Sequence, residues 1–190
     1  MGRFRVLAVG AALAAVTGAA VGCSGASGSA PPATGLPSGS SPTSSPTASV
    51  TVAVTPTVPP AAQAHTKAGA EAFVRFYVDR YNQAGMKPEA GVLKPLSDAN
   101  CVACQNIEAD LSALVQSGHR YANPPLAVPD IRFVATASDG RWGFKMTLRQ
   151  LSTKVLDSSG AVVDTVPAKD FPRQVAVVWR GDQWVMFDME

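Results

Sequence analysis

The sequence predicts an α+β domain in residues 66–190, in which two N-terminal helices pack on a curved antiparallel sheet. Apolar residues first recur at helical spacing, over residues 66–84 and again up to residue 117. After Pro124 and Pro125 the period changes to two, and turn residues separate short strands. Because the helices precede the strands instead of alternating with them, the order indicates an α+β fold and not a parallel sheet.

Residues 1–22, ahead of this domain, are predicted to be a lipoprotein signal peptide. Arg3 and Arg5 form a short basic head, and an uncharged run ending in small residues follows. Phe4 separates the two arginines, so the adjacent pair of a twin-arginine signal is missing. A membrane-spanning helix needs about 20 apolar residues. This run is shorter and consists mainly of Ala, Gly and Val, so we expect its removal rather than an uncleaved transmembrane helix.

The run ends in Ala19-Ala20-Val21-Gly22-Cys23, which resembles a bacterial lipobox with Ala20 in the place where leucine is usual. The resemblance implies that Cys23 is lipidated and becomes the mature N-terminus. Two or three acyl chains would make the attachment permanent, whereas one chain binds a membrane only reversibly. We therefore expect a protein anchored in the cell membrane on its extracytoplasmic face. An incidental cysteine behind an ordinary cleavage site is the alternative.

Residues 23–65 are predicted to be the lipidated N-terminus followed by a disordered tether. Residues 24–65 contain no Asp, Glu, Lys or Arg and are rich in Ser, Thr and Pro. Such a composition buries too little apolar surface to offset the entropy of ordering. As a flexible coil this length averages roughly 35 Å from end to end, so the tether would let the domain stand away from the bilayer.

The charges of the chain argue against two classes of partner. All 14 acidic residues lie in residues 66–190, and Arg3 and Arg5 are the only two of the 16 basic residues outside it, so the predicted domain is formally neutral. A nucleic-acid-binding domain is expected to present a basic face. We therefore expect no nucleic-acid partner, and no binding of an anionic membrane by charge.

The first helix is predicted to begin after Thr66, a favourable N-cap residue. Gly85 and, three residues later, Pro88 are expected to end it. Its apolar stripe comprises Ala70, Phe73, Val74, Tyr77, Tyr81 and Ala84.

The second helix is predicted to begin between Ser97 and Asn100 and to end at Gly118. Asp98 near its first turn would interact favourably with the helix dipole. Its predicted apolar stripe comprises Cys104, Ile107, Leu111, Leu114 and Val115.

Three hairpins are predicted in the last third of the chain. Apolar and polar residues alternate most clearly over 142–149, which is typical of a strand with one covered face. The predicted pairs of strands are 131–136 with 142–149, 154–157 with 161–166, and 174–179 with 183–189, turning respectively at Asp139-Gly140, Ser158-Ser159-Gly160 and Arg180-Gly181-Asp182. The last turn spells an integrin-recognition tripeptide, but its residues also suit a tight hairpin, and we favour the turn.

The helix-first order, the length and the Trp-rich final hairpin resemble the cone-shaped nuclear-transport-factor-2-like fold. More narrowly, a set of short motifs is similar to a family of uncharacterised actinobacterial lipoproteins: Phe73-x-x-x-Tyr77, Tyr81-Asn82-x-Ala84, Leu96-Ser97, Cys101-x-x-Cys104 and Gly118-x-x-Tyr121. This resemblance covers about residues 66–190. It implies a fold and a location in the envelope, and it implies no reaction.

Cys101 and Cys104 form the most conspicuous motif. If Cys23 is lipidated, these two remain as a pair in a compartment that permits disulfides. A dithiol oxidoreductase usually carries such a pair after a strand of a βαβ unit, whereas here a loop and a helix precede it. A tetrahedral metal site needs more ligands, and His65 and His119 are the only histidines. We therefore predict a structural disulfide and no metal or cofactor.

A pocket between helices and sheet is the remaining candidate site. Its predicted lining is Tyr77, Tyr81, His119, Tyr121, Trp142 and Asp188. A ligand pocket is mostly apolar with a few polar groups, so a small apolar ligand would fit it. The alternative is that the aromatic residues fill the core and that His119 is a solvated residue behind a helix.

The sequence favours a lipid-anchored, non-enzymatic module that binds an envelope protein or a small apolar ligand. A cell-surface enzyme of the isomerase or hydratase type is the alternative. Such an enzyme needs a carboxylate and a phenol that converge inside the pocket, for example Asp188 with Tyr77 or Tyr81. Thiol–disulfide exchange by Cys101 and Cys104 is a third hypothesis.

Overall fold

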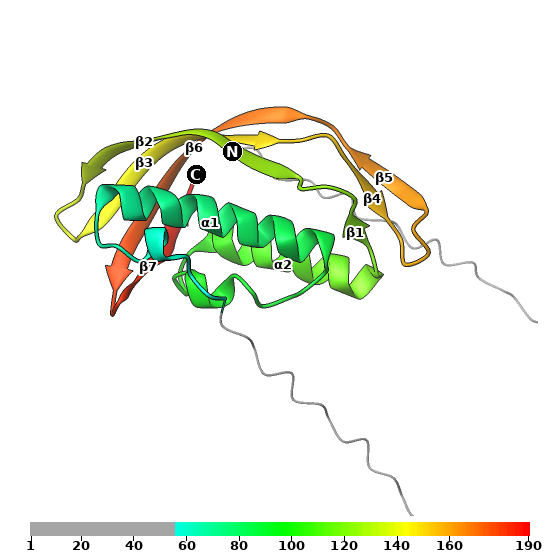
Figure 1. The fold of residues 1–190 in the computed structure, drawn as a ribbon, viewed down its shortest axis with the longest axis horizontal. Coiled ribbons are helices and arrows are strands. Elements are labelled where there is room, and N and C mark those ends of the chain that lie inside the picture. Colours follow the sequence, from blue (N-terminus) through cyan, green and yellow to red (C-terminus); the bar gives the residue numbers. More distant parts are fainter. Residues whose placement is uncertain (1–55) are drawn as a thin grey trace, which may run out of the picture. The chain divides into compact units, whose positions relative to one another are not determined.

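The computed structural model describes residues 56–190 (Figure 1). The predicted signal peptide, Cys23 and most of the predicted tether lie outside the described residues. In the described residues two α-helices are followed by seven strands, and all pairs of these strands are antiparallel. The predicted α+β class, with two helices and antiparallel strands, is confirmed. None of the helices in the described part is both long and apolar enough to cross a bilayer.

Helix α1 spans Lys67–Met86 and begins as predicted. The side-chain oxygen of Thr66 accepts a hydrogen bond of 3.1 Å from the backbone N–H of Gly69, so Thr66 is the N-cap. The helix continues through Gly85, which the sequence predicted as its stop. Gly85 is buried instead under the ring of Tyr121: a Cβ atom there would lie 2.5 Å from that ring.

Helix α2 spans Val102–Ser117 and ends at Gly118, whose φ of 66° is the left-handed conformation of a glycine cap. Leu111 on its predicted stripe is fully buried. The prediction for Val115 was wrong, because 43% of this residue is exposed. Glu108 is buried instead, and its carboxylate accepts hydrogen bonds from the backbone N–H groups of Gly91 and Leu93. These bonds satisfy the buried carboxylate and fix the loop before α2.

The strands form two sheets instead of one meander. A four-stranded sheet has the order β2-β3-β6-β7, and a three-stranded sheet the order β1-β4-β5. The strands are β1 Arg120–Tyr121, β2 Leu126–Thr136, β3 Arg141–Gln150, β4 Thr153–Leu156, β5 Val162–Val166, β6 Lys169–Arg180 and β7 Gln183–Met189. Figure 1 shows α1 lying along one face of β2 and β3, with β1, β4 and β5 beyond the C-terminal end of α1.

Strands β2 and β6 both begin five residues before their predicted starts. Each contains a proline that interrupts the alternating pattern, Pro129 in β2 and Pro172 in β6. Proline is tolerated where no backbone donor is required, which is at sheet edges and bulges. The pairing of β2 with β3 shifts register around Pro129, and the half of β6 that contains Pro172 precedes its pairing with β7.

The core lies between the helices and the four-stranded sheet. Phe144, Met146 and Leu148 of β3 point into it as predicted, next to Val175 and Val177 of β6. From α1 the buried side chains include Phe73, Val74 and Tyr77, and from β7 they include Trp184 and Met186. The alternation of apolar and polar residues in β3 therefore correctly predicted which face of the sheet the helices cover.

The packed structure also includes residues before Thr66. Ala62 is buried, Val58 packs against the core, and the indole N–H of Trp184 donates a hydrogen bond of 2.9 Å to the carbonyl oxygen of Ala64. The charge-free composition of residues 24–65 had suggested that the folded domain starts at residue 66. The domain extends upstream of that residue, because a few apolar residues pack against it there.

Gly69 permits this approach of the upstream segment to α1. A Cβ atom at Gly69 would lie 1.9 Å from the carbonyl oxygen of Ala64, which is a backbone atom and cannot rotate away. We expect Gly69→Ala to lower the free energy of unfolding by about 1–3 kcal/mol, as overpacking does, although alanine is the better helix former. Urea denaturation measures this; Ala68→Gly, at an exposed neighbouring position, should cost about 1 kcal/mol or less. A Gly69→Ala variant as stable as the parent would contradict the close approach.

Candidate functional site

The space between the helices and the four-stranded sheet is occupied by side chains. Trp184, Tyr77, Phe73, Phe144 and Met186 are each less than 2% exposed and belong to one core cluster. Protein interiors packed in this way hold few voids larger than a water molecule. The sequence left open whether the aromatic residues line a pocket or fill the core. In the structure most of them fill the core.

Tyr77 lies in this core and its hydroxyl group has a protein partner. The Tyr77 hydroxyl and the Ser97 Oγ are 3.0 Å apart, and Ser97 Oγ–H also reaches the carbonyl oxygen of Leu93 at 2.8 Å. Burial raises the pKa of Tyr77 to about 12. Tyr77 thus ties α1 to the loop before α2.

Tyr81 and Tyr121 are the two predicted pocket residues that the structure brings together. Their hydroxyl oxygens are 3.5 Å apart, which joins α1 to β1. Burial is the main cause that raises the pKa of both phenols. Asp110 of α2 is close enough to both for its charge to raise these pKa values further, and desolvation raises the pKa of Asp110 itself to about 6.

Sequence reasoning missed Asp110. It stands three residues after Ile107 and four before Leu114, so helical spacing places it beside the apolar stripe of α2. A carboxylate beside the apolar stripe of a helix is the pattern that could have identified Asp110 from the sequence. We call the pair Tyr81 and Tyr121, together with Asp110, whose charge acts on both, the phenol–carboxylate cluster.

The raised pKa of Asp110 predicts how stability depends on pH. The folded state binds a proton at Asp110 that the unfolded state has already lost, so stability should fall as pH rises from about 4 to about 6. Because Asp110 is partly solvated, the contribution is on the order of 1 kcal/mol after screening. We expect Asp110→Asn to raise the free energy of unfolding at pH 7 by that amount and to change little at pH 4. Urea melts at both pH values test this; equal effects at both would contradict it.

Trp142 and Asp188 lie away from the phenol–carboxylate cluster. Trp142 contacts Trp184 edge-on at 5.0 Å between ring centroids, and Phe133 and His65 pack beside it. Asp188 lines a concavity of about 300 Å³ with Arg141. That concavity includes Gly143 and Ala176, which alternate with buried core residues and so lie on the opposite face of the sheet.

Asp188 therefore does not converge with Tyr77 or Tyr81, as the isomerase alternative would require. The Asp188 carboxylate accepts the backbone N–H of Met189 and contributes to the charge around Arg141. His119 follows α2, is partly exposed, and donates its backbone N–H to the carbonyl oxygen of Leu114. The six predicted pocket residues do not converge on one site.

Cys101 and Cys104 form a disulfide at the start of α2. The Cys101 sulfur also accepts a hydrogen bond of 3.2 Å from the backbone N–H of Cys104, and only 1% and 2% of the two residues are exposed. A thiolate must reach a sulfur to exchange with it. Burial of both sulfurs therefore disfavours exchange. Within residues 56–190, no three His, Cys, Asp or Glu side chains gather where they could hold a metal ion.

The disulfide should add modestly to stability, since it closes a very short loop. The loop-entropy relation gives roughly 2 kcal/mol for a loop of this length. We expect the double variant Cys101→Ala/Cys104→Ala to fold and to lose about that much free energy of unfolding in urea. Complete unfolding of the variant would contradict this estimate of the loop effect, and so would no change at all.

The Arg180-Gly181-Asp182 turn has a structural role. Gly181 has a φ of 58°, and Arg180 forms an ion pair with Asp98, whose side chain is only 1% exposed. Asp98 also accepts the backbone N–H of Asn100 at 2.9 Å. Asp98 thus lies before α2 and links the start of this helix to the β6–β7 turn. The sequence had predicted instead that Asp98 interacts with the dipole of the helix.

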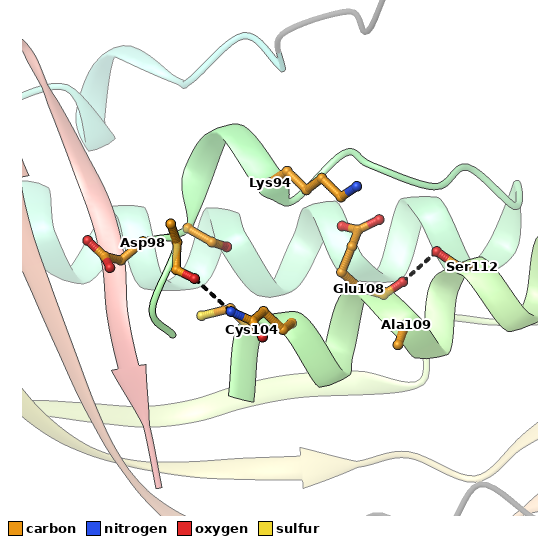
Figure 2. Close-up of a pocket in the computed structure, with 9 residues that line it drawn as sticks. Lys94, Asp98, Cys104, Glu108, Ala109 and Ser112 are labelled. Atoms are coloured by element: carbon orange, nitrogen blue, oxygen red, sulfur yellow. Dashed lines mark hydrogen bonds between the residues drawn. The ribbon is translucent and has the colours of Figure 1, made fainter. Parts of the chain in front are cut away.

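A second concavity, of about 500 Å³, lies between α2 and the loop over residues 94–99 (Figure 2). Lys94 and Ala99 contribute from the loop, and Cys104, Gln105 and Ala109 from α2. Figure 2 shows the side chain of Glu108 extending from α2 toward the loop that carries Lys94. The Gln105 amide N–H donates to the carbonyl oxygen of Ala99 at 2.6 Å and bridges the two sides. We call this concavity the α2 pocket.

Most of the chain matches a known protein family. The family of unknown function DUF6318 matches residues 45–190. The chain belongs to this family. The DUF6318 match includes all of the described residues and begins upstream of them, within the predicted tether. No curated protein matches the chain.

Several solved structures are similar to this DUF6318 chain. The intermembrane space region of the chloroplast protein ARC6 has 13% identity and a TM-score of 0.42, covering 62% of this chain and 92% of its own. Aln2 from a Streptomyces species has 14% identity and a TM-score of 0.42, covering 63% and 87%. A protein named Rd1NTF2_05, with substitutions, has 11% identity and a TM-score of 0.37, covering 64% and 97%. These likenesses concern the fold alone.

Proposed function

We propose that this protein is a lipid-anchored module of the cell envelope that binds a partner through its outer surface and catalyses no reaction. In this proposal residues 1–22 are removed, Cys23 is acylated, and the charge-free stretch that follows connects the membrane to the folded domain. The binding partner is an envelope protein or a small apolar ligand.

The anchor is supported by the small residues that lead to Cys23 at the end of an uncharged run behind Arg3 and Arg5. The other cysteines support it as well. Cys101 and Cys104 are bonded to each other, which leaves Cys23 as the one cysteine of the chain outside that disulfide. The disulfide is also consistent with an oxidising compartment outside the cytoplasm.

The filled interior is the observation that carries the non-enzymatic part of the proposal. An enzyme of this fold class would need a cavity that receives its substrate between helices and sheet. Here Trp184, Tyr77 and Phe144 occupy that space and are fully buried. Binding through the outer surface requires no such cavity.

A dye that fluoresces in apolar pockets tests the filled interior. We expect the interior of the native protein to give no saturable increase in anilinonaphthalene sulfonate fluorescence, whereas acid-expanded proteins with loosened cores do. The same measurement on Met186→Ala is the positive control, since this smaller truncation of a fully buried side chain opens a cavity in the core. Saturable binding of one dye per native protein that Ala109→Glu, a change in the α2 pocket, leaves unaltered would overturn the proposal of a filled interior and favour an internal ligand site.

An isomerase- or hydratase-type activity remains a second candidate function because of the phenol–carboxylate cluster. A carboxyl group with a pKa of about 6 can give and take protons near neutral pH. If Asp110 binds a ligand there, Asp110→Asn and Tyr121→Phe should each abolish a chemical-shift change that a small cyclic ketone causes at Tyr81 in NMR spectra. No ketone-dependent shift in the parent protein would remove this candidate.

A further inference from the structure

The α2 pocket brings charges of both signs to the wall of one cavity. Lys94 contributes a positive charge, and Asp98 and Glu108 contribute negative ones. Asp98 is already paired with Arg180. Neither Lys94 nor Glu108 forms an ion pair with any residue that the structure describes. These two side chains are therefore the unpaired charges of the pocket.

Glu108 is the buried one of these two charges. Only 6% of the residue is exposed, and its two carboxylate oxygens accept the backbone N–H groups of Gly91 and Leu93. A carboxylate offers about four lone-pair sites, so each oxygen can accept one further hydrogen bond. A buried carboxylate without a counter-charge is stabilised when a cationic donor reaches it. Because Glu108 lines the α2 pocket, a ligand in the pocket can supply that donor.

Lys94 is the exposed one of the two charges. Its ammonium group only donates hydrogen bonds, and it is carried on a flexible four-carbon stem. Figure 2 shows Lys94 on the loop and Glu108 on α2, which form the two sides of the pocket. Lys94 thus offers a donor to an anionic group, while Glu108 offers acceptors to a cationic one.

The wall between these charges includes apolar residues. Ala99, Cys104 and Ala109 line the pocket, whose volume is about 500 Å³. Small-molecule sites have volumes of about 300–1,000 Å³ and combine apolar walls with a few polar groups that fix the orientation of the ligand. A ligand with one charge would satisfy either Lys94 or Glu108 and leave the other unpaired. A ligand with both charges satisfies the two together.

We infer that the α2 pocket binds a zwitterion with an apolar body, which is the chemistry of a free amino acid with an aliphatic side chain. The ammonium group of the ligand donates to Glu108, its carboxylate accepts from Lys94, and both contacts are charge-assisted hydrogen bonds. The aliphatic chain lies against Ala109. The inference goes beyond the proposed function and does not rest on the acylation of Cys23, which contributes no group to the pocket.

A titration with three six-carbon compounds tests the inference. Norleucine carries both charges, hexylammonium only the positive one and hexanoate only the negative one. The full-length chain in phospholipid nanodiscs is observed by nuclear magnetic resonance, and the amide signals of Gly91 and Leu93 report on Glu108. We expect norleucine to shift both signals saturably. It should bind roughly five-fold more tightly than either singly charged compound, because each of these lacks one ionic contact.

Removal of the positive charge tests the role of Lys94. Lys94→Met keeps a side chain of similar length at an exposed position, so the domain should remain folded. We expect this change to weaken norleucine binding roughly five-fold, the upper range for an exposed ion pair. Binding of hexylammonium should stay as it is in the parent. Lys87→Met, at an exposed lysine that does not line the pocket, is the matched control and should bind norleucine like the parent.

A second pair of variants tests the location. Ala109→Leu fills part of the pocket and should abolish norleucine binding, whereas Ala113→Leu, at an exposed position of α2 that does not line the pocket, should not. No saturable shift at Gly91 and Leu93 would overturn the inference, and so would hexanoate or hexylammonium that binds as tightly as norleucine. A Lys94→Met or Ala109→Leu variant that binds norleucine like the parent would overturn it as well.

Discussion

Replacement of Trp184 by alanine should unfold the domain or come close to doing so. The side chain is fully buried, contacts Trp142 and Trp179 edge-on at 5.0 and 5.1 Å, and donates its indole N–H to the carbonyl oxygen of Ala64. Truncation of a buried tryptophan typically costs about 3–5 kcal/mol. Domains have about 5–15 kcal/mol of stability in total, so the loss is a large part of it.

Trp184→Phe is the matched control for this prediction. Phenylalanine keeps an aromatic ring in the core but removes the donor to Ala64, so we expect a smaller loss, on the order of 2 kcal/mol. Urea unfolding followed by far-UV circular dichroism measures both variants. If Trp184→Ala lost less than about 1 kcal/mol, well under the usual cost of such a truncation, Trp184 could not be the centre of the core that the structure describes.

Replacement of Cys23 by alanine should abolish acylation of the protein completely. Only a sulfur at that position can carry the lipid in the proposed anchor, since Cys101 and Cys104 are bonded to each other and buried. A tagged fatty acid supplied to the growing host should label the parent chain, and the Cys23→Ala variant should carry no label. Ser24→Ala, one residue further on, should be labelled like the parent.

The acylation experiment also separates the anchor from an uncleaved signal peptide. Each buried methylene of an acyl chain contributes about 0.8 kcal/mol to membrane binding. An acylated chain should therefore remain with the membranes although residues 1–22 are gone. Label on the Cys23→Ala variant, or a parent chain without label, would contradict the proposed anchor.

The parts of the fold that sequence predicted best are those governed by local rules. Thr66 as a cap fixed the start of α1, and Gly118 marked the end of α2. Gly140, Gly160 and Gly181 have positive φ in the three predicted hairpin turns. Each of these features depends on a few neighbouring residues, so composition and spacing were sufficient.

The parts that sequence could not predict depend on contacts between distant residues. The side-chain amide of Asn82 both donates to the carbonyl oxygen and accepts from the backbone N–H of Leu126, 44 positions away. Asp98 pairs with Arg180, and the charge of Asp110 acts on the phenols of Tyr81 and Tyr121. Periodicity shows which face of a helix is buried, but it does not show which polar group faces which. For that reason the sequence did not show that Asp188 lies on the other face of the sheet from the core.

The mass of the mature protein, isolated intact from the membranes of its own host, tests the proposed anchor most directly. We expect a chain that begins at Cys23, with the added mass of two or three acyl chains on that residue and two mass units missing for the disulfide between Cys101 and Cys104. A mature chain that begins at any other residue, or one that carries no acyl mass, would contradict the account.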